Sequence, residues 1–178
     1  MADSGNTKRL LAQSLKQLLQ AQPLCKISIG EICEQCGMNR KSFYYHFHDK
    51  YDLIIWIFET EFLAKSRGVT YASSWEFLFA LCSYFEHNRI FYRRALEISG
   101  QNSLDEHLRS LVHPAVIQLF PGLSEGDPRL LFYVHYYSDA FLAAIRRWLN
   151  EKSPLDAASF VQMIRSAMER PTHLPEMK

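Results

Sequence analysis

No stretch of this chain alternates apolar and polar residues with a period of two over a useful length, so a β-sheet is excluded as its main framework. Apolar residues instead recur at helical spacing, as Leu11, Leu15 and Leu18 do. The chain has 178 residues but only seven Gly and seven Pro, so few positions interrupt these patterns. We predict an all-α protein that is long enough to bury a core unaided.

Helix breakers and capping residues divide the chain into two sets of predicted helices. Three short helices come first, with a Gly-containing turn between the second and the third, which is the outline of a helix-turn-helix. Longer helices follow. The predicted ranges are 7–22, 28–37, 39–47, 50–66, 75–87, 90–98, 104–120, 129–151 and 155–169. We therefore expect a helix-turn-helix DNA-binding domain over 1–49, a helical regulatory and dimerisation domain over 50–170, and a tail over 171–178.

The charge of the chain is nearly balanced overall but uneven along its length. Twenty Lys and Arg stand against nineteen Asp and Glu, which argues against a protein that coats nucleic acid by bulk charge. The first 50 residues carry seven basic and four acidic residues, a net charge of +3, and the remainder carries a net charge of −2. A nucleic-acid contact is therefore expected near the N-terminus.

Cysteine usage and hydropathy bear on the compartment. Four Cys in a chain of this length do not form a disulfide framework, and no charged start precedes an apolar leader. Uninterrupted apolar runs such as 77–82 are too short to span a bilayer. These features predict a protein of the reduced cytoplasm, without a membrane partner.

Two groups of residues carry a metal or redox alternative. Cys33 and Cys36 have C-x-x-C spacing, but no second Cys pair is nearby and free Cys is a small buried hydrophobe. His135 and Asp139 are four residues apart on one predicted helix, and two side chains are weak evidence for a metal. We favour structural roles for both groups and predict no metal and no cofactor.

The segment 28–53 resembles the DNA-binding segment of TetR-family transcriptional regulators. The family pattern combines a small-residue-Gly turn, a hydroxyl residue, a run of aromatic residues and His, and a Lys three positions on. Its elements here are Cys36-Gly37, Ser42, Phe43, Tyr44, Tyr45, His46, Phe47 and Lys50. The match is specific and lies within the first third of the chain.

The resemblance and the side-chain chemistry together predict how DNA is contacted. Arg40 and Lys41 begin the recognition helix and offer donors suited to guanine O6 and N7, while Asn39 caps that helix. Phe43 and Phe47 should anchor it to the core. The remaining contacts are assigned to phosphates, except that Tyr44 would touch a thymine methyl or a phosphate. The predicted DNA-binding residues are Ser28, Arg40, Lys41, Ser42, Tyr44, Tyr45, His46 and Lys50.

One position departs from the family pattern. Gly30 stands where many members have a longer polar or basic side chain in the first turn of the second helix. The sequence therefore predicts that one supplementary base or phosphate contact is absent.

The C-terminal two thirds resemble the family in style, with two long final helices of the kind that pair subunits. The helix at 130–149 is apolar on nearly every side in its first four turns, which calls for a partner subunit. We expect a homodimer whose interface includes Phe160, Val161, Ile164 and Met168. The stretch 91–104 also looks like a subgroup of dihydroxyacetone-kinase-type regulators.

The abundance of aromatic residues leaves room for a ligand cavity, although most of these side chains should be plain core. The candidates for lining it are Trp56, Phe85, His113, Tyr133 and Tyr137. With no acidic cluster among them, a neutral or weakly anionic organic effector is expected. The predicted function is a ligand-responsive, homodimeric repressor that binds palindromic double-stranded operator DNA.

Two other functions, a protein-binding co-regulator and an enzyme, agree less well with the sequence. A member of the same fold could act by binding another protein as a co-regulator, but Tyr44 and Lys50 of the DNA-binding pattern are present. An enzyme is disfavoured because no arrangement of nucleophile, base and oxyanion donors emerges from the sequence.

Overall fold

The structure is a computed structural model and describes residues 4–97, 104–118, 120, 122–124 and 126–169. All regular secondary structure in these residues is helical and no strand occurs among them, which confirms the all-α prediction. The predicted tail at 171–178 lies outside the described residues.

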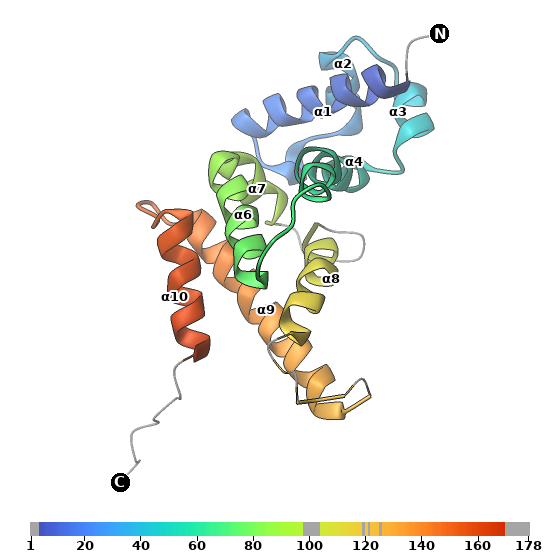
Figure 1. Cartoon of the computed structure of the whole chain (residues 1–178). Helices are drawn as coiled ribbons and strands as arrows, with labels where there is room; N and C mark the ends of the chain where they lie inside the picture. The colour runs from blue at the N-terminus through green and yellow to red at the C-terminus, as the bar shows by residue number, and fades with distance from the viewer. Residues whose placement is uncertain (1–3, 98–103, 119, 121, 125, 170–178) are drawn as a thin grey trace.

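The N-terminal end of the molecule consists of α1 (Ser4–Ala21), the 3-10 helix η1 (Leu24–Lys26), α2 (Ile29–Gln35) and α3 (Arg40–His46). Figure 1 shows these elements together at one end of the molecule, in blue to cyan. One stripe of α1 is fully buried because its leucines recur at helical spacing. This stripe and the residues of α2 and α3 that are buried with it are Leu11, Leu15, Leu19, Ile32 and Phe43.

One long helical segment joins this end to the rest of the chain, and it is not a regular α-helix. It runs through α4 (Lys50–Phe58), the π-helix η2 (Glu59–Leu63) and α5 (Ala64–Ser66), where the sequence predicts a single helix. The N–H of Ala64 bonds to the C=O of Glu59, five residues back, which defines the wider turn. In Figure 1, α4 lies between α1 and α8, and it packs against both.

The C-terminal part is built from α6 (Ser74–His87), α7 (Arg89–Ala95), α8 (Leu104–Ile117), α9 (Pro128–Asn150) and α10 (Ala157–Glu169). Helix α8 packs along α9, and α10 packs along α6. Trp148 of α9 anchors α10, because its ring stacks on Phe160 at 4.6 Å and its Nε1 donates to the C=O of Leu155. No described helix is long and apolar enough to cross a membrane.

A buried carboxylate holds α8 to α9. Asp105, 5% exposed, accepts from Nη2 of Arg109 at 3.0 Å and from Nη1 of Arg146 at 2.6 Å. Arg109 also pairs with Asp139 on α9. Each oxygen of this desolvated carboxylate thus accepts from a guanidinium donor, which offsets the cost of burying the charge.

A second polar chain connects α1 to the C-terminal core through η2. The ammonium of Lys16 lies 2.5 Å from the carboxylate of Glu61, which also accepts from the hydroxyl of Tyr84 at 3.1 Å. The hydroxyl of Tyr92 donates to that of Tyr84 at 2.8 Å. Burial raises the pKa of both tyrosines, so both hydroxyls keep the protons that they donate. We call these four residues the Lys16–Tyr92 chain.

Candidate nucleic-acid interface

The start of α2 is fixed by a reciprocal cap, as its sequence predicts. The Ser28 hydroxyl accepts from the N–H of Glu31 at 3.2 Å, and the Glu31 carboxylate accepts from the N–H of Ser28 at 2.7 Å. The bond from the Ser28 N–H lowers the pKa of Glu31. The Ser28 hydroxyl also donates to Glu31 at 2.7 Å, so a phosphate contact through its proton would have to break that bond. The DNA contact of Ser28 stays a prediction.

The turn between α2 and α3 depends on one glycine. Gly37 has φ +67°, in the left-handed region that residues with a Cβ rarely adopt. The N–H of Gly37 bonds to the C=O of Glu34 at 3.1 Å, and that of Met38 to the C=O of Cys33 at 2.8 Å. These bonds close α2 and set the angle at which α3 leaves it.

Both cysteines of the C-x-x-C pair are free thiols and serve this turn. Cys33 is buried, and the thiol of Cys36 lies 3.3 Å from the C=O of Ile32, to which it donates. Neither takes part in a disulfide, and their positions suit the core role favoured from the sequence.

The recognition helix α3 has one buried and one open side. Asn39 caps it by accepting from the N–H of Ser42 at 2.8 Å. Phe43 and Phe47 are 0% and 3% exposed and anchor the helix as predicted. Tyr44 and Tyr45, by contrast, are 58% and 83% exposed.

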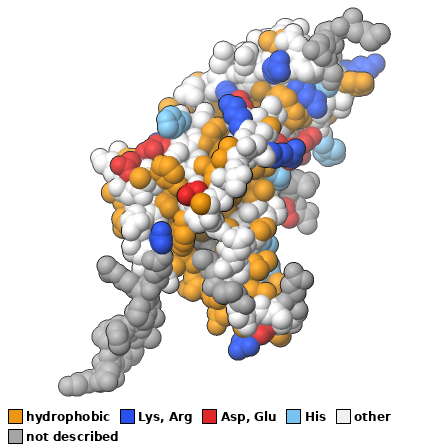
Figure 2. All heavy atoms as spheres, viewed as in Figure 1, with side chains coloured by type: hydrophobic (Ala, Val, Ile, Leu, Met, Phe, Trp, Pro, Cys, Tyr) orange, Lys and Arg blue, Asp and Glu red, His pale blue; other side chains and the backbone are white. Residues whose placement is uncertain are grey.

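The open side of α3 collects donors and aromatic rings on a short stretch. Arg40 and Lys41 are exposed at its N-terminal end, and Ser42 and His46 are half-buried beside the exposed tyrosines. On the face drawn in Figure 2, most Lys and Arg side chains lie over the end of the molecule formed by α1 to α4. Positive charge and exposed rings are the means by which helix-turn-helix proteins contact DNA.

Lys50 has partners that the sequence did not predict. Its ammonium donates to the C=O groups of Leu24 and Ile27, each at 2.7 Å. Desolvation lowers its pKa. The side chain thus ties the start of α4 to η1, while Asp49 caps α4 by accepting from Tyr51 and Asp52. A phosphate contact by Lys50 would use the donor that these two bonds leave over, and it stays a prediction.

The comparisons with known proteins agree with this geometry. Residues 14–56 match the model of bacterial regulatory proteins of the tetR family, and residues 73–170 match the transcriptional regulator C-terminal region of TetR proteins. The second match spans more than half of the chain. The chain belongs to the TetR family. It is therefore a DNA-binding transcriptional regulator and not an enzyme.

One curated TetR-family relative is the HTH-type dhaKLM operon transcriptional activator DhaS of Lactococcus lactis subsp. lactis. It is 29% identical over 99 residues, which are 55% of this chain and 53% of that protein. The match thus spans about half the length of the relative. The predicted resemblance to dihydroxyacetone-kinase-type regulators is confirmed.

Three solved structures share the fold of this TetR-family chain along nearly its whole length. A TetR regulator from Streptococcus agalactiae has a TM-score of 0.70 at 20% identity, covering 94% of this chain and 96% of its own. The dihydroxyacetone kinase operon activator DhaS has a TM-score of 0.62 at 21% identity, covering 91% and 96%. NalD, the secondary repressor of the MexAB-OprM multidrug efflux pump in Pseudomonas aeruginosa, has a TM-score of 0.63 at 16% identity, covering 93% and 96%.

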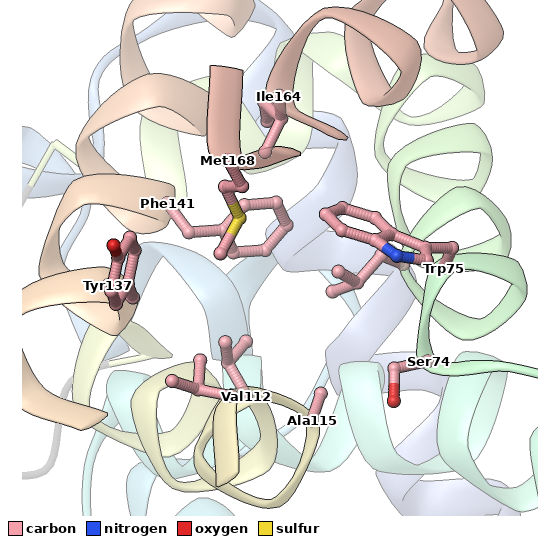
Figure 3. Close-up of a pocket in the computed structure, with 10 residues that line it drawn as sticks. Ser74, Trp75, Val112, Ala115, Tyr137, Phe141, Ile164 and Met168 are labelled. Carbon is pink, nitrogen blue, oxygen red and sulfur yellow. The ribbon is translucent and has the colours of Figure 1, made fainter. Parts of the chain in front are cut away.

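In the C-terminal part of this TetR-family chain, an apolar cavity lies under α10 (Figure 3). Figure 3 shows Trp75, Phe141 and Met168 pointing toward one another from α6, α9 and α10. The free volume of this cavity is about 20 Å³, enough for little more than one water molecule. We call it the α10 cavity. Its lining is Ser74, Trp75, Leu78, Val112, Ala115, Val116, Tyr137, Phe141, Ile164 and Met168.

The five residues predicted to line a ligand pocket do not converge on this cavity. Tyr137 lines it, whereas Phe85 is fully buried against Tyr92 with ring centroids 4.5 Å apart. Trp56 does not line it and instead packs on Phe47, with the ammonium of Lys8 over its ring.

The other two candidates, His113 of α8 and Tyr133 of α9, each pack against another aromatic ring. His113 lies edge-to-face with His135, with ring centroids 5.6 Å apart. Tyr133 stacks on Phe120 at 4.8 Å. Across the described residues, no group of three His, Cys, Asp or Glu lies in position to hold a metal ion.

The four residues predicted for the dimer interface lie on the side of α10 that faces the chain's own core. Phe160 and Val161 are buried, and Ile164 and Met168 are half-buried beside the α10 cavity. The apolar residues that α9 and α10 leave exposed are different ones. They include Leu131, Phe132, Tyr136, Ala140 and Ala143 of α9, and Met163 of α10.

Proposed function

We propose that the chain acts as a homodimer whose two α3 helices enter successive major grooves of a palindromic operator, about 34 Å apart. The observation that carries this proposal is the open side of α3, where Arg40, Lys41, Tyr44 and Tyr45 are exposed opposite the buried Phe43. Arg40 and Lys41 are assigned to base edges, and Tyr44 to a thymine methyl or a phosphate. The phosphate contacts are assigned to Ser28, Ser42, Tyr45, His46 and Lys50.

Electrophoretic shift with the promoter upstream of the gene tests the operator contact directly. Because several contacts per subunit go to phosphates, the logarithm of the affinity should fall steeply with the logarithm of the salt concentration. Tyr45→Phe removes one phosphate donor from a fully open position and should weaken all sequences alike. An affinity that does not change with salt, or the absence of a specific shift on any palindromic site, would contradict the proposal.

We assign the dimer contact to the exposed apolar side of α9 rather than to the four residues predicted from the sequence. Phe132 and Tyr136 are 62% and 57% exposed, and Ala140 and Ala143 continue the same stripe at helical spacing. Exposed aromatic rings followed by small residues allow close approach of a symmetry-related helix. Family membership supports dimer formation as such.

Two charge insertions distinguish the surfaces. Tyr136→Asp should give monomers that remain folded, because the side chain is exposed in the single subunit. Val161→Asp should instead destabilise each subunit, since it buries an unpaired charge. Sedimentation velocity combined with circular dichroism measures both. Folded dimers from Tyr136→Asp would overturn the assignment to α9.

The proposed signal is a neutral or weakly anionic organic molecule that enters the α10 cavity. Its lining is apolar apart from Ser74, Trp75 and Tyr137, and the hydroxyl of Ser74 already donates to Gln118 at 2.5 Å. In the described conformation the cavity is too small for such a molecule, so binding must move α10 and its side chains Ile164 and Met168. A ligand that favours the moved state shifts operator binding by its differential affinity for the two states.

Filling the cavity tests this effector site. Ala115→Leu should occupy the space and abolish the response of a promoter reporter to inducing compounds while leaving operator affinity unchanged. Ala158→Leu, at an exposed position of α10, is the matched control. Tyr137→Phe should shift the ligand dose alone. If the response survives Ala115→Leu, the effector binds elsewhere.

The direction of regulation has two candidates. A repressor is the prediction from the sequence, while the 29% identical relative is named a transcriptional activator, which favours activation. Deletion of the gene and measurement of the transcript from the bound promoter separate them: the transcript rises for a repressor and falls for an activator.

A further inference from the structure

Gly30 occupies the second position of α2, where a glycine has no backbone reason to stand. Among the described residues the glycines with positive φ are Gly37 and Gly126, and Gly30 is not one of them. The Ser28 and Glu31 cap holds the surrounding turn in helical conformation. In that conformation Gly is less favourable than Ala because it has more freedom to lose. A reason for the glycine must therefore lie outside the backbone.

The space beside Gly30 is filled by the side chain of Arg40. A Cβ atom built on Gly30 would lie 2.7 Å from Nη2 of Arg40, 3.2 Å from its Nε and 3.3 Å from its Cζ. The first of these distances is shorter than a carbon and a nitrogen can approach without one of them moving. All three of the nearest atoms belong to the guanidinium of Arg40.

The guanidinium lies beside Gly30 on the surface of α2. Cys33 is one helical turn further along the same helix. Burial raises the pKa of the Cys33 thiol, and the positive charge of Arg40 acts on it in the opposite direction. This agrees with a guanidinium held near the Gly30 side of α2. Arg40 is also the first residue of α3, and its backbone is fixed by the Asn39 cap. The backbone of Arg40 is thus fixed, and its guanidinium lies beside Gly30.

We propose that Gly30 is a specificity-determining position, because its missing side chain provides the space that sets where the Arg40 guanidinium meets the edge of a base pair. This rests on the proposed contact of Arg40 with operator bases. A guanidinium reads guanine through two parallel hydrogen bonds, whose geometry tolerates little displacement. A methyl group at position 30 would push the flexible end of Arg40 off α2 without disturbing the fold.

The position of Arg40 also explains why Gly30 departs from the family pattern, in which many members have a longer side chain at this point of the second helix. A longer side chain at position 30 and an arginine lying over that position exclude each other in space. The sequence alone suggests a lost contact at Gly30, whereas the structure indicates an exchange in which Arg40 takes the room.

The test compares Gly30→Ala, Arg40→Ala and the double variant in the full-length protein. Each is incubated with a library of DNA duplexes whose base pairs are randomised across both half-sites, and bound duplexes are sequenced. Affinities are then measured by fluorescence anisotropy on the best duplex and on one that differs at the base pair whose preference Arg40→Ala loses. Gly68→Ala is the matched control, because no atom lies within 4 Å of a Cβ built there.

Gly30→Ala should lose about tenfold in preference at the same base pair as Arg40→Ala. The double variant should lose no more than Arg40→Ala does, and the midpoint of thermal unfolding of Gly30→Ala should not fall, because Ala is the better helix former. Gly68→Ala should retain the full preference.

Three results would overturn the inference: a preference that survives Gly30→Ala, an equal loss on all duplexes, or additive losses in the double variant. An equal loss would mean that Arg40 contacts a phosphate. If the wild-type protein enriches no sequence from the library, the operator contact itself fails, and that outcome is distinct from the three.

Discussion

The two ends of the molecule differ in how completely their buried polar groups are satisfied. In the part built from α1 to α4, side chains cap the starts of α2, α3 and α4, and Lys50 occupies two carbonyls of η1. The described residues also contain buried polar atoms without a hydrogen-bond partner, and these all belong to the C-terminal part built from α6 to α10. They are Nη1 of Arg89, Nη1 of Arg94, Nε2 of His107, Nε2 of His113 and Oγ of Ser138.

The difference indicates which part of the molecule is fixed in one conformation and which part can change its conformation. A surface that must match DNA gains from one well-fixed conformation, because ordering it on binding would cost affinity. Under the proposed function the C-terminal part responds to a signal, and such a response requires a second arrangement at little cost. Buried polar groups without a hydrogen bond and the α10 cavity both lower the stability of the described arrangement.

The largest effect that sharpens this comparison comes from the anchor of the recognition helix. Phe43→Ala should cost about 3–5 kcal/mol of unfolding free energy, because a fully buried ring leaves a cavity in a small, close-packed core. Urea denaturation followed by circular dichroism measures it. Tyr45→Ala, at a position 83% exposed, should change stability by less than about 0.5 kcal/mol. Similar losses for both variants would mean that this end is not close-packed.

A smaller effect is expected between the two parts. Tyr84→Phe breaks the Lys16–Tyr92 chain in the middle and leaves the buried Tyr92 hydroxyl without its acceptor, which should cost about 1–2 kcal/mol. The conservative control is Tyr45→Phe, whose hydroxyl lies at the surface. Unfolding free energies that agree for Tyr84→Phe and wild type would show that the chain adds nothing to the joining of the two parts.

One substitution made in both parts should have opposite signs. Ser28→Ala removes a helix cap and should destabilise the protein by about 1 kcal/mol. Ser138→Ala removes a hydroxyl that is 0% exposed and has no partner, and it should stabilise the protein by about 1 kcal/mol. Thermal unfolding of the two variants side by side measures the difference. A loss of stability in both would remove the contrast drawn here.

The smallest effect concerns pH. The pKa of His113 lies below its ordinary value of 6.5, because burial, His135 and Arg109 all disfavour the charged ring more than Asp139 favours it. Below about pH 6.5 the unfolded chain therefore binds more protons at this residue than the folded one, and stability falls as the pH is lowered. Unfolding midpoints of wild type and His113→Gln between about pH 7.5 and pH 5.5 test this. Parallel curves for the two proteins would contradict it.

Features that depend on neighbours in the sequence were predictable. The reciprocal cap at Ser28, the turn at Gly37 and the anchoring phenylalanines of α3 follow from spacing and residue type, and the structure contains all of them. The helix ranges also agree to within a few residues, because each break is marked by Pro, Gly or a capping residue.

Features that depend on the direction of a side chain in the tertiary structure were not predictable. Aromatic residues occur both in cores and in ligand pockets. The sequence therefore predicts Phe85 and Tyr137 alike as pocket residues, although only Tyr137 reaches the cavity. Likewise, the sequence shows an apolar side of α10 but does not say whether Val161 on that side packs against the chain's own core or against a partner subunit. The space shared by Gly30 and Arg40 appears only when α2 and α3 are packed together.

The wide turn η2 has a consequence for how sequences of this kind should be aligned. A π-turn holds one residue more than a turn of α-helix, so it is equivalent to an α-helix that has gained one residue. Removing one residue elsewhere in a helix would rotate everything beyond it by about 100°. Removing one between Glu59 and Leu63 would instead restore regular hydrogen bonding and keep α4 and α5 on their present sides. Gaps of a single residue are therefore expected here, in the middle of an otherwise uninterrupted helix.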